Sequence, residues 1–274
     1  MSQPVVFLGP TLDIVEARGI LDADYRPPAR CGDVLRAVLQ GAQRIGIVDG
    51  FFHAVRSVRH AEILLALEDG VEVVGAASMG ALRAAECAAF GMVGIGEVFA
   101  RYRSGELERD DAVAVLHDGG DAGYRPISDA LVDMCDAYAA AANDGVVDGR
   151  TAAWLCTRAE SMHYTERTYR RVVADAVDEG VVGSTHPLLE FLAAHRPTLK
   201  QRDARALLRH LRDPATVRTT PTEVAVTSHT QALIDEVRSQ WFPWGRILPG
   251  TLRAASASAS ESAQTTLVGA KRAD

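Results

Sequence analysis

One serine stands where a predicted strand runs into a predicted helix. The strand is the β-branched segment 71–74, and the helix is 79–90, which is rich in strong helix formers. Small residues on both sides of Ser78 permit a sharp turn and a close approach by a substrate. Ser78 can therefore act as a nucleophile, because the free amides of the first helical turn and the helix dipole would stabilise an oxyanion. The alternative is a capping serine, since Ser is also a preferred N-cap.

The string A-A-S-M-G at 76–80 is the G-x-S-x-G elbow with Ala in place of the first Gly. This pattern makes Met79 and Gly80 candidate oxyanion or substrate-binding residues. On the same helix, Arg83 and Glu86 are three positions apart and can form an ion pair. Arg83 is also a candidate anchor for a carboxylate terminus, because its planar fork suits that group.

The chain offers few amines that could act as a base for the serine. Its only lysines are Lys200 and Lys271, and Lys271 lies in a segment predicted to be disordered. Arginine cannot serve, because its pKa is above about 12. We therefore predict that Lys200 lies near Ser78 and takes its proton, with a pKa lowered by burial or by a neighbouring cation. The alternative is a solvated lysine in the first turn of a helix that begins near Thr198.

The remaining candidates are polar residues near strand ends or on helices. Thr11 and Asp49 follow predicted strands and are candidate substrate-binding residues, although both can also cap or hold loops. His60 and Glu62 share a predicted helix. Together with Glu86, they are interpreted as residues that support the site without touching the substrate. Asp110 and Asp111 lack a third ligand at usable spacing, so the sequence predicts no metal site.

Alternating strands and helices are expected to position these residues. Apolar segments predict strands at 4–8, 44–48 and 71–74, separated by helices at 12–21, 33–39 and 58–67. This order predicts an α/β fold with a short parallel sheet and flanking helices in the N-terminal half, and ligands bind beyond the carboxyl ends of such strands.

The second half is predicted to be helical. Helices are expected at 128–143, 151–160, 165–179, 187–194 and 201–211, after a loop at 90–96 and an alternating strand at 112–117. We divide the chain into an α/β core (1–127), a helical region packing on it (128–213), a loosely ordered extension (214–253) and a disordered Ser/Ala-rich tail (254–274).

Composition excludes several classes of protein. A net charge of −7 argues against nucleic-acid binding. No apolar stretch is free enough of charge to span a membrane. The four cysteines are far apart and contain no C-x-x-C, so they are predicted to be reduced thiols of a cytoplasmic protein, and no cofactor is expected.

Several strings resemble the TfuA-like proteins. The longest is G-A-A-S-M-G-A-L-R-A-A-E at 75–86, which is specific, and the others are G-P-T-L at 9–12, I-G-I-V-D-G-F-F at 45–52, H-A-E-I-L at 60–64, F-G-M at 90–92, the segment 105–117, and L-K-Q-R-D-A at 199–204. The resemblance covers most of residues 5–211.

TfuA-like proteins are partners of YcaO enzymes in thioamidation, which replaces a peptide backbone oxygen by sulfur. The resemblance implies a Ser–Lys hydrolase-like site that releases sulfide from the C-terminal thiocarboxylate of a small ubiquitin-like sulfur carrier. It also implies help in engaging the precursor peptide. The implied partners are thus a YcaO enzyme, the carrier and the peptide.

Two strings depart from the family pattern. Ala61 and Ala112 stand where family members often have Lys and Glu. If Ala61 replaces a functional lysine, the site is damaged, and the chain would be a non-catalytic adaptor for a YcaO enzyme. The third hypothesis is an unrelated α/β serine hydrolase of small molecules, in which His117 is a candidate base.

Overall fold

The computed structural model describes residues 3–53, 55–195 and 197–213, together with residues 232 and 235. The predicted tail (254–274), and the predicted extension (214–253) apart from those two positions, lie outside the described residues.

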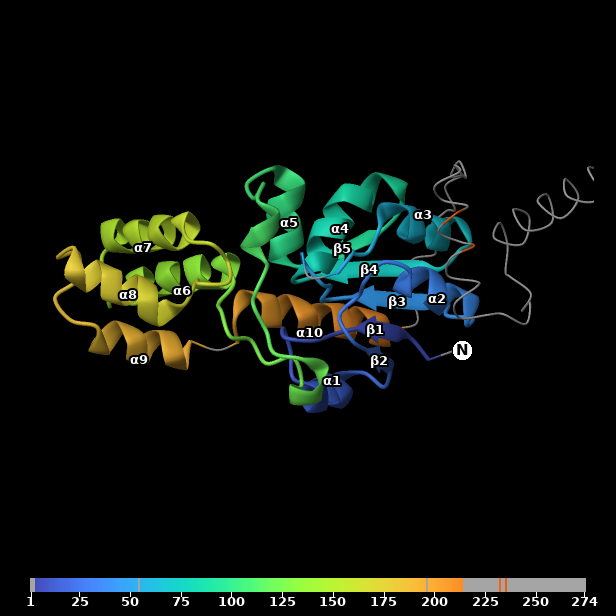
Figure 1. Cartoon of the computed structure of the whole chain (residues 1–274), viewed down its shortest axis with the longest axis horizontal. Helices are drawn as coiled ribbons and strands as arrows, with labels where there is room; N and C mark the ends of the chain where they lie inside the picture. The colour runs from blue at the N-terminus through green and yellow to red at the C-terminus, as the bar shows by residue number, and fades with distance from the viewer. Residues whose placement is uncertain (1–2, 54, 196, 214–231, 233–234, 236–274) are drawn as a thin grey trace, which may run out of the picture.

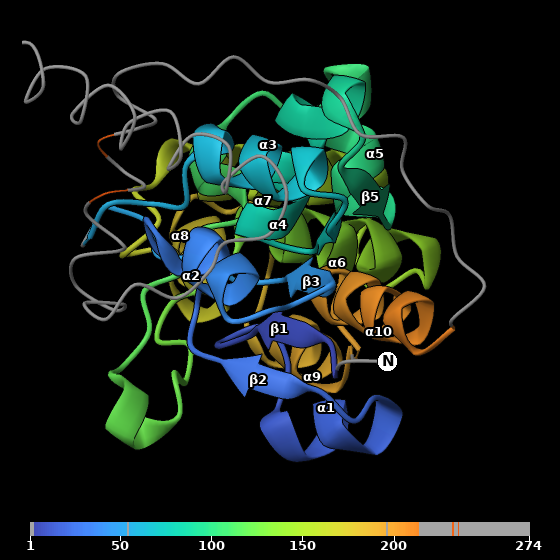
Figure 2. The ribbon, with the colours of Figure 1, turned by 90° about the vertical axis from the view of Figure 1, so that its right-hand side faces the viewer.

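A parallel sheet forms the centre of the N-terminal half (Figures 1 and 2). Within the described part of the chain it has five strands in the order β2-β1-β3-β4-β5. The strands are β1 (Val5–Phe7), β2 (Asp24–Arg26), β3 (Arg44–Ile47), β4 (Glu72–Ala76) and β5 (Val93–Ile95). This order confirms the predicted parallel sheet, and it is typical of doubly wound α/β folds.

Helices cover both faces of the sheet. One face packs against α1 (Ile14–Ile20) and α10 (Leu199–Arg212). The other packs against α2 (Asp33–Leu39), α3 (His60–Glu68), α4 (Met79–Cys87) and α5 (Glu97–Ser104). The period-two alternation of a strand produces these two layers: in β1, Val6 belongs to the core under α10, whereas Val5 and Phe7 belong to the core on the opposite face.

The second half is helical, as predicted. Helices α6 (Leu131–Asn143), α7 (Gly149–Ser161), α8 (Tyr169–Asp178) and α9 (His186–Ala194) form a group beside the sheet, on the left of Figure 1. After them the chain returns, and α10 packs on β3 and β4. This return brings Lys200 back to the sheet.

Three predictions about local structure are wrong. Strands β2 and β5 were not predicted, and β5 lies in the segment interpreted as a glycine-rich loop. The expected strand 112–117 is instead a 3-10 turn, Asp110–Ala112, followed by irregular chain with one bridge between His117 and Pro126. An alternating segment forms a strand only where a neighbour supplies a continuous row of backbone partners, and here segment 125–128 bonds only near its end, at Leu116 and Asp118.

The prediction of four reduced thiols is also wrong. Cys135 and Cys156 form a disulfide that joins α6 to α7, whereas Cys31 and Cys87 are free thiols. The two bonded residues are 21 positions apart in sequence, and pairing of α6 with α7 brings them together. The cytoplasmic expectation therefore loses the support that these two cysteines gave it.

Glu62 fixes the packing of α2 on α3. Its buried carboxylate accepts hydrogen bonds from the backbone N–H groups of Gly32, Val34 and Leu35 at the start of α2, and from that of Arg59 at the start of α3. Burial raises the pKa of Glu62 to about 7, although these N–H groups act to lower it. Glu62 is thus a structural lock between two helices.

This raised pKa predicts how stability depends on pH. Because the pKa of Glu62 in the folded protein exceeds its ordinary value of 4.5, the native state binds the proton more tightly than the unfolded state. The free energy of unfolding should therefore fall as pH rises from 4.5 to 7, by about 3 kcal/mol, and then stay level. Denaturant titrations at several pH values measure this change.

The Glu62→Gln variant should abolish this pH dependence, since Gln mimics the protonated carboxyl. The control is Glu106→Gln, whose side chain is 67% exposed and which should keep the wild-type slope. An unchanged slope in Glu62→Gln would contradict the assignment.

Candidate active site

Ser78 lies in a tight turn between β4 and α4. The residue before it, Ala77, is buried and has a φ of 65°, and the backbone N–H of Ser78 donates to the carbonyl of Ala76 at 2.7 Å. A non-glycine residue rarely adopts a positive φ, and such strain is concentrated at functional sites. The turn directs the serine away from the strand axis at the carboxyl edge of the sheet.

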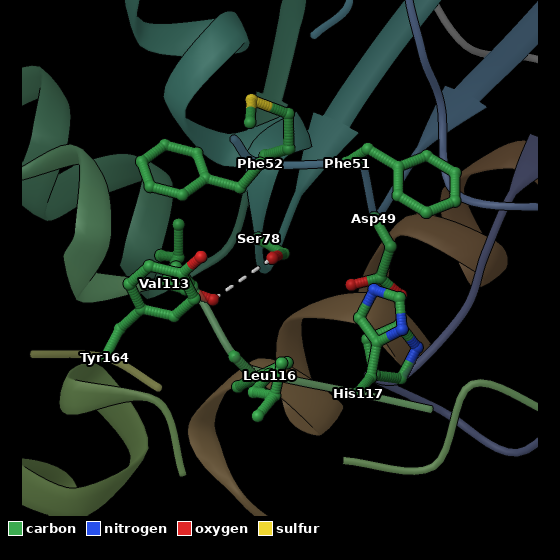
Figure 3. Close-up of a pocket in the computed structure, with 13 residues that line it drawn as sticks. Asp49, Phe51, Phe52, Ser78, Val113, Leu116, His117 and Tyr164 are labelled. Atoms are coloured by element: carbon green, nitrogen blue, oxygen red, sulfur yellow. Dashed lines mark hydrogen bonds between the residues drawn. The ribbon is translucent and has the colours of Figure 1, made fainter. Parts of the chain in front are cut away.

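The Ser78 hydroxyl does not cap the helix. Ser78 occupies the N-cap position of α4, but its side chain accepts no hydrogen bond from the first turn. Instead its Oγ donates to the carbonyl oxygen of Val113 at 3.3 Å, the dashed line in Figure 3. The structure therefore does not show the capping arrangement that was the alternative for this residue.

Close backbone packing holds the start of α4 against the sheet. A Cβ on Gly80 would lie 1.7 Å from the carbonyl oxygen of Ile47 in β3, so only glycine fits. The N–H of Gly80 donates to the carbonyl of Val48 at 3.3 Å and so already has an acceptor. By contrast, the N–H of Met79 donates to no acceptor among the described residues. Of the two predicted oxyanion donors, Met79 is therefore the one whose N–H is available in this part of the structure.

Lys200 is buried rather than solvated. It is 3% exposed, and its Nζ donates to the carbonyl oxygen of Val113 at 2.9 Å. Its backbone N–H donates to Oδ1 of Asp133 at 2.8 Å, which ties the start of α10 to the start of α6. Ser78 and Lys200 thus share one acceptor atom, so their polar atoms lie within two hydrogen-bond lengths of each other.

Thr11 and Asp49 form a second polar unit beside this pair. Asp49 accepts from the Thr11 hydroxyl at 2.6 Å, and from the backbone N–H groups of Thr11 and Gly9 at 3.1 and 2.9 Å. The carboxylate therefore joins the loop after β1 to the end of β3. Thr11 does not cap α1 as the sequence suggested, because the N-cap is Asp13.

These elements enclose a pocket of about 140 Å³ (Figure 3). Its lining contains Ser78, Met79 and Asp49, and its walls are largely apolar. Further lining residues are Pro10, Gly50, Phe51, Phe52, Val113, Ala114, Val115, Leu116, His117 and Tyr164. The small volume and apolar walls suit a narrow acyl group better than a bulky side chain.

His117 is held by its neighbours at this pocket. Its ring lies 5.9 Å from that of Phe51 and 5.6 Å from that of Tyr124. Its Nδ1 lies 2.7 Å from the carbonyl oxygen of Asp118. Because a carbonyl only accepts, Nδ1 carries the proton, and Nε2 of the neutral ring is left as an acceptor.

Four predicted site residues lie elsewhere. Arg83 donates to the carbonyl of Val58 and to Glu86, and His60 also contacts Glu86, at 2.8 Å. Burial acts to raise the pKa of Glu86, but hydrogen bonds from His60 and Arg83 lower it. Together with Glu62, these residues are absent from the pocket lining. The structure does not place Arg83 where it would meet a carboxylate bound at Ser78.

The central atom of the site, the carbonyl oxygen of Val113, could not be predicted from the sequence. Any residue type supplies a backbone carbonyl, so no sequence signal marks this one. The aromatic residues Phe51 and Phe52 directly follow Asp49-Gly50 at a strand end, and that position is the signal that could have found them.

Within the described residues, no group of three His, Cys, Asp or Glu side chains could hold a metal ion. The same part of the chain contains no helix with the length and apolar character needed to cross a membrane.

A comparison with protein families finds a match for part of the chain. Residues 49–168 match the family model of TfuA-like protein. Over this segment, the chain is similar to the TfuA-like family. The TfuA-like segment contains Asp49, Ser78 and Val113, and it ends before Lys200. No curated protein matches the chain.

The single long hydrogen bond of the Ser78 hydroxyl predicts the stability of a Ser78→Ala variant. The substitution removes one long hydrogen bond and no cap, so the free energy of unfolding should fall by less than about 1 kcal/mol. The comparison variant is Thr198→Ala, which breaks the capping box of α10 and should cost about 1 kcal/mol or more. Thermal unfolding measures both, and a larger loss for Ser78→Ala would show that its hydroxyl is structural.

Proposed function

We propose that this chain is an accessory protein of YcaO-dependent peptide backbone thioamidation, which hydrolyses a thiocarboxylated ubiquitin-like sulfur carrier to deliver sulfide. The observation that carries the proposal is the shared acceptor, since Ser78 Oγ and Lys200 Nζ both donate to the carbonyl of Val113. The TfuA-like match supports the pathway.

The first step is attack by Ser78 Oγ on the carbonyl carbon of the thiocarboxylate. Ser78 Oγ and Lys200 Nζ both donate to the Val113 carbonyl. In the reactive form Lys200 is a neutral amine, whose lone pair accepts the proton of Ser78. The C–S bond breaks, and the proton taken from Ser78 passes to the sulfur, which leaves as hydrosulfide.

The second step frees the carrier. Water attacks the ester carbon of the acyl-enzyme, the bond to Ser78 Oγ breaks, and the hydroxyl regains a proton. The carrier leaves with an ordinary C-terminal carboxylate. In both steps the N–H of Met79 would donate to the oxyanion, because it has no acceptor among the described residues. Neither step requires a cofactor.

The proposal includes three partners: a YcaO enzyme, the sulfur carrier and the precursor peptide whose backbone is modified. It places the protein in the cytoplasm, with no role at nucleic acid or at a membrane. Sulfide released beside YcaO would be used before it diffuses away, so contact with that enzyme is part of the function.

A non-catalytic adaptor is the second candidate. The observation that favours it is that the TfuA-like match ends at residue 168, so Lys200 lies outside the matched segment. However, Lys200 Nζ shares the Val113 acceptor with Ser78, so the pair has an amine although position 61 is Ala. Neither Ala61 nor Lys200 is among the residues that line the Ser78 pocket. An unrelated small-molecule hydrolase would need His117 as its base, and this residue does line the pocket.

The proposal predicts that Ser78→Ala stops sulfide release. The nucleophile is lost, so the rate should fall by two orders of magnitude or more. Mass spectrometry would follow the thiocarboxylated carrier as its terminal sulfur is replaced by oxygen, and it would detect the acyl-enzyme. The control is Ser161→Ala in the helical region, which should keep the wild-type rate.

A wild-type protein that leaves the carrier intact, yet binds YcaO and peptide, would favour the adaptor. An unchanged rate in folded Ser78→Ala, with loss of activity in His117→Ala, would favour the unrelated hydrolase.

A further inference from the structure

A fully buried arginine stands behind the turn that carries the shared carbonyl. Arg167 is 0% exposed, although it lies in the segment between α7 and α8. Its Nε donates to the carbonyl of Ala159 at 3.0 Å, and one terminal nitrogen donates to the carbonyl of Met162 at 3.1 Å. Burying a guanidinium costs free energy unless its donors are hydrogen-bonded. Packing alone therefore does not account for an arginine at this position.

The remaining donors of Arg167 bind a single residue of the turn. They reach the carbonyl oxygen of Asp111 at 3.2 Å and its Oδ2 at 3.0 Å. The same Asp111 carbonyl accepts from the N–H of Val113 and, at 3.2 Å, from that of Ala114. Arg167 therefore binds the Asp111 carbonyl, and this carbonyl orients the backbone of Val113, two positions further along the chain.

We propose that Arg167 is a positioning residue for the Ser78–Lys200 pair: through Asp111 it fixes the Val113 carbonyl that aligns both side chains. This inference rests on the proposed function. The planar fork of arginine meets four acceptors on the end of α7 and on the turn at once, which a lysine cannot do. The helical region thereby determines the geometry of a site at the edge of the sheet.

A second arginine, Arg109, binds the same turn through the Asp111 carboxylate. Arg109 donates to Oδ1 and Oδ2 of Asp111 at 2.8 and 3.0 Å, and to the carbonyl of Glu160 at 2.7 Å. Burial acts to raise the pKa of Asp111, but the hydrogen bonds from Arg109 and Arg167 lower it, so this carboxylate stays charged at neutral pH. Of the two arginines, only Arg167 also holds the Asp111 backbone among the described contacts.

The test is Arg167→Lys, which keeps the positive charge and loses the fork. We expect kcat for sulfide release to fall by 10- to 100-fold with KM within twofold of wild type. We also expect the pH dependence of kcat/KM to shift, because Lys200 would lose its fixed acceptor. A role in stability alone would lower the melting temperature without moving the pH profile.

The matched control is Arg158→Lys. Arg158 lies on α7, pairs with Asp175 at 2.7 Å and makes no contact with the turn in the described structure. This variant should keep the wild-type kcat and pH profile. Equal kinetics for the two folded variants would overturn the inference.

Asp111→Asn covers the case in which Arg167→Lys does not fold. It keeps the size of the side chain and removes its charge, and it should shift kcat and the pH profile in the same direction. A folded Asp111→Asn with wild-type kinetics would overturn the inference.

Failure of the proposed function can be distinguished from failure of the positioning role of Arg167. If wild-type protein releases no sulfide, the rate at which a fluorophosphonate labels Ser78 replaces kcat as the readout. In that reaction Ser78 Oγ forms a bond to phosphorus, fluoride leaves and the base takes the proton. Slower labelling of Arg167→Lys than of Arg158→Lys supports the positioning role, whereas equal labelling, or none in wild-type protein, overturns it.

Discussion

The carbonyl oxygen of Val113 accepts one hydrogen bond from Ser78 and one from Lys200, and the site depends on this atom. A carbonyl oxygen has two lone pairs, so it can accept from both donors at once. Both donors are buried, and each would pay a desolvation penalty if the acceptor moved. The relative position of the Ser78 and Lys200 side chains is therefore only as well defined as the position of the Val113 peptide.

Three parts of the chain must meet for this arrangement to form. The sheet supplies Ser78 through the turn at Ala77, the turn at Asp110–Ala112 supplies the acceptor, and α10 supplies Lys200. The helical region contacts the last two parts separately, since Asp133 in α6 binds the backbone of Lys200 and Arg167 binds Asp111. Docking of the helical region thus brings the acceptor and Lys200 to the sheet edge that carries Ser78.

The elements that local sequence determines could be predicted, and those that depend on distant partners could not. The central strands β1, β3 and β4 are β-branched and apolar, so they are visible in the sequence. The edge strands β2 and β5 have three residues each, and β2 reads Asp-Tyr-Arg, so their strand character comes from pairing with a neighbour. The Cys135–Cys156 bond was missed for the same reason, because it depends on how α6 packs on α7.

The same distinction between local and distant determinants applies to the residues of the candidate site. Ser78 could be found from its place between a strand and a helix, and Lys200 from the scarcity of amines, because both signals are local or compositional. Arg83 was misplaced because helical spacing reports which residues share a face, but not which face meets the ligand. In the structure, Arg83 donates hydrogen bonds to the carbonyl of Val58 and to Glu86.

Asp133 joins the environment of Lys200 to the helical region. Its carboxylate accepts the backbone N–H of Lys200, and burial raises the pKa of Asp133 while the charge of Lys200 acts to lower it. The position of Lys200 is therefore fixed at two points, by Asp133 at its backbone and by the Val113 carbonyl at its Nζ. Under the proposed function, the proton that Lys200 takes from Ser78 passes to the sulfur, so a fixed Nζ would couple activation of the nucleophile to protonation of the leaving group.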